Sequence, residues 1–161
     1  MKTLILYATK YGSTKHCASL LSDKLPGTIA VHQINEHVAL SQFDRIIVGS
    51  PIRMGRVNNK IKNFCEKNKT FLLTKDVSLF LCCSFAEHAQ NYFDTNFDRA
   101  LLKHCTLKSC FGGILDPARL RGFDRFFIKA AAKSHNLSSG GILTENIDKF
   151  VQLLGSELLQ K

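Results

Sequence analysis

The fold of this chain follows from one stretch, Leu4-Ile5-Leu6-Tyr7-Ala8-Thr9-Lys10-Tyr11-Gly12-Ser13-Thr14. Its first five residues are almost all apolar, which is typical of a short strand buried on both faces of a parallel sheet. A helical pattern begins after Thr14, so the loop between strand and helix ends at a helix N-terminus. Unpaired backbone N–H groups and the positive end of the helix dipole make such a terminus an anion site.

The side chains of the loop favour the same interpretation. Thr9, Ser13 and Thr14 add hydroxyl donors, and Gly12 permits a positive φ or the close approach of a ligand. Lys10 and Tyr11 complete the loop. A phosphate monoester fits this arrangement. The simpler alternative is a helix capped by Ser or Thr after a buried strand, with no ligand.

Residues 5–14 resemble, at every restricted position, the phosphate-loop signature of flavodoxins, small proteins that bind flavin mononucleotide (FMN). Neither the Walker sequence G-x-x-x-x-G-K-[ST] nor the dinucleotide fingerprint G-x-G-x-x-G occurs in the chain. The resemblance implies FMN as the cofactor. It also implies a single flavodoxin-like domain over residues 1–161, of the α/β class, with helices on both faces of a doubly wound, five-stranded parallel sheet of order 2-1-3-4-5.

The order of the predicted elements agrees with that class. Apolar runs predict strands at residues 4–8, 28–32, 44–49, 77–83 and 107–115. Helical spacing predicts helices at residues 14–25, 57–67, 89–103 and 118–133, and a last helix that opens at Thr144. Strands that alternate with helices in this way build a parallel sheet. The 161 residues suffice for one domain with a sizeable core.

Two further loops are expected beside the phosphate loop. Strands 1 and 3 of such a sheet flank the topological switch point, where ligands bind. The segment after strand 3 should therefore line the same crevice, and it consists of Ser50, Pro51, Ile52, Arg53, Met54 and Gly55. A plain connector between strand and helix is the alternative. The segment after strand 4 should form a third loop over the cofactor, made of Cys83, Ser84 and Phe85, with Phe85 either covering the flavin or packing in the core.

Composition limits the classes of partner. Lys and Arg number 22 and Asp and Glu number 13, which gives a formal net charge of +9 with histidine neutral. Such a surplus favours an anionic partner. No nucleic-acid motif or aromatic basic platform occurs, so we expect no nucleic acid partner. We expect an anionic or hydrophobic small-molecule substrate, or a redox partner protein.

The six cysteines are expected to be free thiols. No C-x-x-C pair occurs, and most of the cysteines lie in apolar runs, as expected in a reducing cytosol. We expect no metal site. The N-terminus has no signal-peptide pattern, and no apolar run approaches the ~20 residues that span a bilayer. The sequence therefore predicts a cytoplasmic protein.

The predicted helix 118–133 has two contrasting faces. An apolar face carries Leu120, Phe123, Phe127, Ala130 and Ala131, and the opposite face carries Arg121, Arg125, Lys129 and Lys133. One interpretation is a core helix with a solvated basic face. The other is a peripheral contact with an anionic membrane, at its inner face, or with an anionic partner.

Within the flavodoxin superfamily, the chain most resembles the bacterial menaquinone-dependent protoporphyrinogen dehydrogenases. The motifs that carry this resemblance are residues 1–6, Gly49 to Gly55, Gly122 to Lys129, and Ser139-Gly140-Gly141. It implies an FMN enzyme that oxidises protoporphyrinogen IX and passes electrons to a quinone at the membrane. That family carries a longer, strongly basic insertion after strand 4, whereas residues 84–102 here are shorter and nearly neutral.

The charges near the second loop bear on the chemistry. From Ser50 to Lys60 the chain has no carboxylate and three cations, Arg53, Arg56 and Lys60. One cation ~6 Å from an anion, at an effective dielectric constant of ~20, stabilises that anion by ~3 kcal/mol. For a two-electron couple this raises the potential by roughly 60 mV. Such a flavin favours substrate oxidation over low-potential electron donation, and arginines also suit substrate carboxylates.

Three hypotheses follow, with no catalytic residue assigned. The first is an FMN-dependent dehydrogenase for a hydrophobic, carboxylate-bearing substrate such as a porphyrinogen. The second is an electron-transfer protein that docks a redox partner and has no small-molecule substrate. The third is a flavodoxin-like module without cofactor. His88 is the nearest candidate for a protein acid or base.

Overall fold

The structure of this protein is a computed structural model, and it describes residues 1–113 and 141–158. Five parallel strands form the sheet in the order β2-β1-β3-β5-β6, with bounds Thr28–Gln33, Lys2–Tyr7, Arg45–Arg53, Asp76–Cys82 and Leu107–Cys110. This is the predicted order of the five predicted strands. A short sixth strand, β4 (Arg56–Val57), pairs antiparallel with the end of β3.

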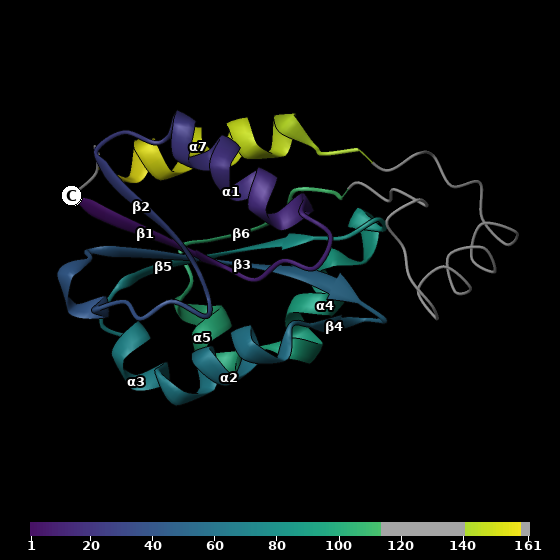
Figure 1. The fold of residues 1–161 in the computed structure, drawn as a ribbon, viewed down its shortest axis with the longest axis horizontal. Coiled ribbons are helices and arrows are strands. Elements are labelled where there is room, and N and C mark those ends of the chain that lie inside the picture. Colours follow the sequence, from purple (N-terminus) through teal and green to yellow (C-terminus); the bar gives the residue numbers. More distant parts are fainter. Residues whose placement is uncertain (114–140, 159–161) are drawn as a thin grey trace, which may run out of the picture.

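Helices cover both faces of the sheet, as Figure 1 shows. Helices α1 (Ser13–Lys24) and α7 (Thr144–Leu158) lie on one face. The other face is covered by α2 (Asn59–Lys67), α3 (Lys69–Leu72), α4 (Ala89–Asn96) and α5 (Arg99–His104). Two short 3₁₀ turns complete the described elements, η1 (Leu40–Gln42) and η2 (Ala86–His88).

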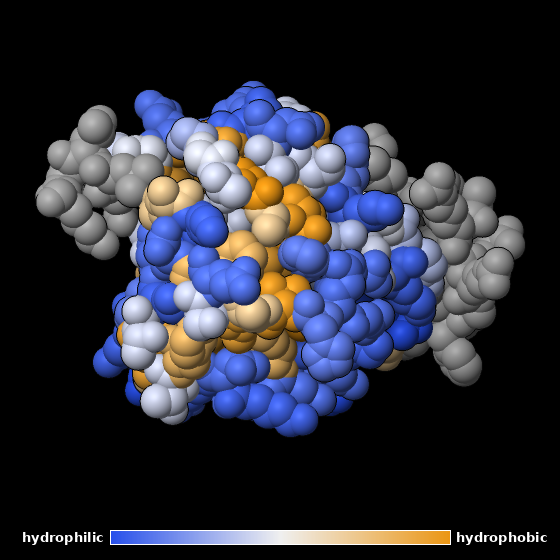
Figure 2. Space-filling view, turned by 60° about the vertical axis from the view of Figure 1, so that its left-hand side comes forward, coloured by the Kyte–Doolittle hydropathy of each residue, from blue (hydrophilic) through white to orange (hydrophobic). Residues whose placement is uncertain are grey.

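Each face of the sheet has its own core. Alternate residues of β1 point to opposite faces, so Leu4 and Leu6 join the cluster under α2 to α5, while Ile5 and Tyr7 join the cluster under α1 and α7. Burial of these apolar strands on both sides is what a parallel sheet requires. Figure 2 shows that hydrophobic residues also form a band across one face of the molecular surface, between hydrophilic areas.

Aromatic packing fixes the spacing of the sheet and the last helix. The rings of Phe80 and Phe111 stack with centroids 4.7 Å apart, and Phe150 of α7 meets Phe111 edge-on at 5.3 Å. The Phe80 ring also covers Gly49 of β3, where an added Cβ would lie 2.1 Å from Phe80 Cζ. Only glycine therefore fits at this point of the central strand.

One ion pair is buried at the start of the central strands. Arg45 is 3% exposed, and its Nε donates to Asp76 Oδ2 at 2.7 Å across the β3–β5 pair. The second oxygen of Asp76 accepts a hydrogen bond from the Thr106 hydroxyl at 2.8 Å. Pairing of this kind is what allows an arginine to be buried.

Several predicted boundaries were wrong. The helix predicted from residue 57 begins at Asn59, because Arg56–Val57 turns back to pair with β3. The helix predicted over residues 89–103 is two helices, since the Asp98 side chain caps a new one by accepting from Ala100 N–H. Strand β6 ends at Cys110, and Gly112 makes an antiparallel bridge to Ile142.

Other predictions were confirmed, and one lies outside the described residues. All six cysteines are free and buried. The last helix opens at Thr144, as predicted, and it buries Ile147, Phe150 and Leu154. Among the described residues, no helix is both long enough and apolar enough to span a bilayer. The basic helix predicted over residues 118–133 belongs to the part of the chain that the structure does not describe.

Candidate functional site

The phosphate loop connects β1 to α1 at the carboxyl edge of the sheet. Gly12 occupies the N-cap position of α1 with a φ of 98°, a left-handed conformation that favours glycine. Its N–H donates to Thr9 Oγ1 at 3.0 Å, which closes the loop. Gly12 has no side chain with which to cap the first turn of α1, and this turn contains no acidic residue. A helix start of this kind suits an anion.

A buried hydroxyl in this loop provides a test of the fit to a phosphate group. Thr14 is 1% exposed, and its Oγ1 makes no hydrogen bond of ordinary length and angle with the described part of the chain. Its hydroxyl interacts only weakly with the Cys82 thiol: hydrogen bonding to Cys17 and burial raise the pKa of that thiol well above its ordinary value, and the contact with Thr14 lowers it in part. A buried hydroxyl without a partner is costly. A ligand acceptor at the helix start would satisfy it, so the residues present fit a phosphate.

A pocket at this edge brings together parts of all three predicted loops. Its lining includes five residues of the phosphate loop, two residues near the end of β3 and two residues that follow β5, namely Thr9, Lys10, Tyr11, Ser13, Thr14, Pro51, Ile52, Cys83 and Ser84. Cys82 and Gly113 also line the pocket, and the sequence analysis did not assign them. Cys82 ends β5, and Gly113 follows the end of β6 by three residues.

The other predicted residues do not line this pocket. Gly12 shapes the backbone, whereas Ser50 is 1% exposed and joins β3 to the start of α2 by accepting from Asn58 N–H at 2.9 Å. Phe85 precedes η2, with its ring centroid 6.3 Å from that of His88. The His88 ring in turn lies 6.3 Å from the Tyr92 ring and is absent from the pocket lining. The structure therefore gives His88 no place among the residues around the pocket.

Residues Arg53, Met54 and Gly55 form a hairpin at the end of β3. Met54 and Gly55 have φ values of 51° and 75°, which is the pattern of a two-residue hairpin turn. The turn places Arg53 directly opposite Arg56 and leaves Met54 67% exposed. The predicted connector is thus a projecting ribbon with two arginines side by side.

A side chain that the sequence analysis missed holds this hairpin in place. Asn96 of α4 is 9% exposed, and its Oδ1 accepts from Val57 N–H at 3.0 Å. Its Nδ2 donates to Gly55 O at 2.9 Å and to Tyr92 O at 2.8 Å. The Asn96 amide therefore ties the hairpin to α4. No sequence motif marks an asparagine for this role.

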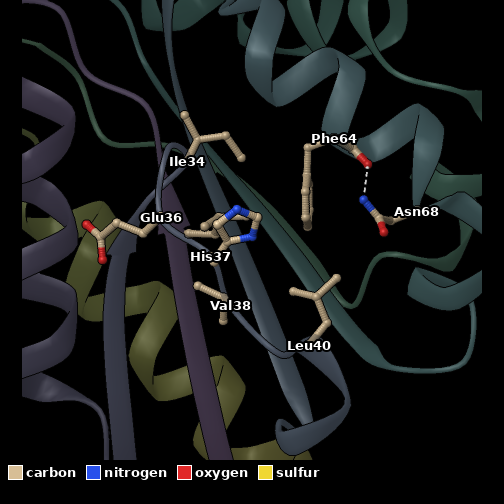
Figure 3. Close-up of a pocket in the computed structure, with 8 residues that line it drawn as sticks. Ile34, Glu36, His37, Val38, Leu40, Phe64 and Asn68 are labelled. Atoms are coloured by element: carbon tan, nitrogen blue, oxygen red, sulfur yellow. Dashed lines mark hydrogen bonds between the residues drawn. The ribbon is translucent and has the colours of Figure 1, made fainter.

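A second cavity lies elsewhere. It measures about 210 Å³ and is lined by Leu6, Ile34, Glu36, His37, Val38, Leu40, Phe64 and Asn68. Figure 3 shows the apolar side chains after β2 facing Phe64 of α2, while Glu36 points away. The Asn68 amide donates to the Phe64 carbonyl oxygen at 2.9 Å. None of the predicted cofactor residues lines this cavity, so the pocket at the phosphate loop remains the candidate site.

Comparison with known proteins settles the family. The family model for the flavodoxin domain matches residues 4–139. The chain belongs to the flavodoxin family. Its family membership, together with the glycine at the helix start and the buried Thr14 hydroxyl, supports FMN as the cofactor of this chain.

Individual relatives agree with this assignment. Protoporphyrinogen IX dehydrogenase [quinone] from Escherichia coli K12 is 29% identical over 145 residues, which cover 83% of this chain and 80% of that protein. Flavodoxin 1 from Bacillus cereus superposes with a TM-score of 0.51 at 16% identity, covering 84% of this chain and 99% of that one. A flavoprotein from Lactobacillus acidophilus, solved in complex with FMN, gives 0.52 at 17% identity, covering 70% and 91%.

Proposed function

We propose that this protein is an FMN-dependent oxidoreductase that oxidises a porphyrinogen-like substrate, as a protoporphyrinogen IX dehydrogenase does, and passes the electrons to a quinone. The observation that carries the proposal is 29% identity to such a dehydrogenase over most of both chains. FMN, when bound, supplies the redox chemistry by accepting two electrons. The chain's own residues bind the cofactor, orient the substrate and set the local charge.

The hairpin supports an anionic substrate. Arg53 and Arg56 are directly opposite each other in the β3–β4 pair, and both are exposed. Two guanidinium groups in this position suit a carboxylate, because each can donate two parallel hydrogen bonds to it. The arrangement therefore favours a substrate that carries acidic groups.

The hairpin is also close to the pocket. Pro51 and Ile52, which line the pocket, immediately precede Arg53 in β3. Lys60, at the start of α2, adds a third cation, with its Nζ 2.6 Å from Asn35 Oδ1. The positive charge favours an anionic reduced cofactor and raises the potential of the flavin. This direction suits an enzyme that takes electrons from an organic substrate.

The proposal is tested by mixing the oxidised FMN-loaded protein anaerobically with protoporphyrinogen IX. We expect the flavin absorbance to bleach within minutes and protoporphyrin fluorescence to appear. Replacing Arg53 and Arg56 together by glutamine should raise KM about 100-fold, through loss of two charged contacts each worth ~1.5 kcal/mol. Lys62→Gln, an exposed cation of α2 that pairs with Glu66, is the matched control and should leave KM unchanged.

Absence of bleaching would contradict the enzyme proposal and favour the electron-carrier hypothesis. A redox titration then separates the two. A carrier should show two one-electron steps with one very low potential, whereas the proposed enzyme should show a single two-electron step at a higher potential. Failure of the protein to take up FMN at all would contradict both.

A further inference from the structure

Two thiols meet at the wall of the pocket. Cys83 directly follows β5 and Cys110 ends β6, and their sulfur atoms lie 3.2 Å apart. The two strands are parallel neighbours, with Leu81 in register with Cys110 and Phe111 N–H donating to Leu81 O at 2.8 Å. A disulfide is only about 1 Å shorter than this separation, so the two sulfur atoms must approach by that distance to form one.

The surroundings favour a thiolate on Cys110. The Cys83 thiol and the backbone N–H groups of Gly112 and Cys83 donate to its sulfur, and they lower the pKa of Cys110 to about 7, against burial and the charge of Glu87. The same contact and burial raise the pKa of Cys83. The backbone at Cys110 is itself held, because Asn146 Nδ2 donates to its carbonyl oxygen at 2.7 Å.

The remaining thiols lack this arrangement. Cys82 also has a thiol neighbour, Cys17, but Cys17 is 0% exposed, and their contact raises the pKa of Cys82. Burial raises the pKa of Cys65 to about 12 and that of Cys105 to about 12. A thiol with such a pKa is a poor nucleophile at neutral pH.

The pocket reaches the pair through Cys83, which lines it beside Ser84 and Gly113, and the Cys110 sulfur lies behind, 3.2 Å from that of Cys83. Each of the two cysteines is 6% exposed overall, so the Cys83 side chain must swing aside before a disulfide in the pocket reaches Cys110. We propose that Cys83 and Cys110 form a dithiol–disulfide site, which is oxidised reversibly by a low-molecular-weight disulfide. This activity does not use the flavin chemistry proposed above, and it shares only the pocket with the cofactor, because Cys83 lines the pocket assigned to FMN.

The oxidation of the two thiols proceeds by two successive thiol–disulfide displacements. The Cys110 thiolate attacks one sulfur of the disulfide R–S–S–R, forming a mixed disulfide and releasing RS⁻. The Cys83 thiol gives its proton to that thiolate and attacks the Cys110 sulfur, forming the internal disulfide and releasing a second RS⁻. Two protein thiols are oxidised, and one external disulfide is reduced to two thiols. Excess thiol reverses both steps.

The test uses the full chain, reduced and freed of reductant, in mixtures of glutathione and glutathione disulfide. After acid quenching, free thiols are alkylated in denaturant and counted by intact mass. We expect two of the six thiols to disappear with no retained glutathione. Tryptic digestion should then link residues 76–99 to residues 109–119. Six reactive thiols at every ratio, or only mixed disulfides, would overturn the proposal.

Cys82 and Cys83 lie in one tryptic peptide, so cysteine variants are needed to show which of them is linked to Cys110. Cys82→Ala and the control Cys65→Ala should keep it. Cys83→Ala and Cys83→Ser should abolish it and retain one glutathione on Cys110. Persistence of the link in both Cys83 variants would refute the assignment. In the wild type, alkylation of Cys110 should be half-maximal near pH 7, and half-maximal alkylation only above pH 9 would argue against an activated thiolate.

Discussion

Replacing Thr14 by valine should stabilise the FMN-free protein against unfolding and weaken its binding of FMN. Valine has nearly the shape of threonine, so the change removes little besides the hydroxyl. That hydroxyl is buried at the start of α1 and has no hydrogen-bond partner among the residues that the structure describes. If its partner is the phosphate of FMN, the hydroxyl destabilises the FMN-free protein and stabilises the complex with FMN.

The two effects have opposite signs and separate magnitudes. An unsatisfied buried polar group costs about 1–3 kcal/mol, so the FMN-free Thr14→Val variant should gain roughly 1 kcal/mol in free energy of unfolding. For a chain of this length, that gain raises Tm by about 2–4 °C. A hydrogen bond to a charged phosphate contributes about 1.5–3 kcal/mol, so the Kd for FMN should rise about 10- to 150-fold.

Thermal unfolding of the FMN-free protein and quenching of FMN fluorescence on titration measure the two quantities. Ser78→Ala is the matched control, because Ser78 is 0% exposed and carries the other buried hydroxyl found without a partner in the described residues. Ser78→Ala should stabilise the protein without changing the Kd for FMN. If Thr14→Val binds FMN as tightly as the wild type, this hydroxyl does not hold the phosphate.

Three further predictions concern the framework of the site. Asn96→Ala should lower the free energy of unfolding by about 2 kcal/mol in urea titrations, because it leaves the N–H of Val57 without its partner; Asn91→Ala, on the exposed side of the same helix, should change it little. Gly49→Ala should destabilise the protein by at least about 1–3 kcal/mol, because the added Cβ would overlap the Phe80 ring. Gly155→Ala in α7 should stabilise the protein by up to ~1 kcal/mol, because no atom lies within 4 Å of the added Cβ. Equal effects of the two substitutions in urea titrations would contradict the packing described. The Lys69 ammonium and the N–H of Ala100 hold the pKa of the Asp98 carboxyl below 3.8. Their stabilisation is therefore present at neutral pH and is lost as the pH falls through that lowered pKa. Asp98→Asn keeps a capping side chain but loses the ion pair with Lys69, so the Tm of the variant should lie below that of the wild type at pH 7 and approach it in acid. A difference in Tm that does not change with pH would argue against the ion pair.

The sheet could be predicted because its strands are short apolar runs with clear limits. Residues 4–8 could only be a strand buried on both sides, and the phosphate loop after them indicated both the topology and the edge that carries the site. The burial of Ile5 and Leu6 on opposite faces follows directly from that pattern. The left-handed conformation of Gly12 followed from the same loop.

The parts that the sequence did not reveal depend on long-range contacts. The turn at Met54 and Gly55 uses a methionine at a φ of 51°, where asparagine or aspartate is the usual signal, so the hairpin carried no strong local mark. Its clamp, Asn96, lies 41 residues from Gly55 in the chain. The break at Asp98 did carry a capping signal, and helical spacing on both sides of it concealed that signal.

The amide of Asn96 has a mechanical consequence for how such proteins diversify. Because this side chain grips the turn from α4, the paired arginines move with that helix and not with the sheet alone. Lengthening the chain between β5 and α4 would therefore tilt the guanidinium groups as well as remodel the third loop. A change in the length of that segment would therefore alter the hairpin without any substitution in the hairpin itself.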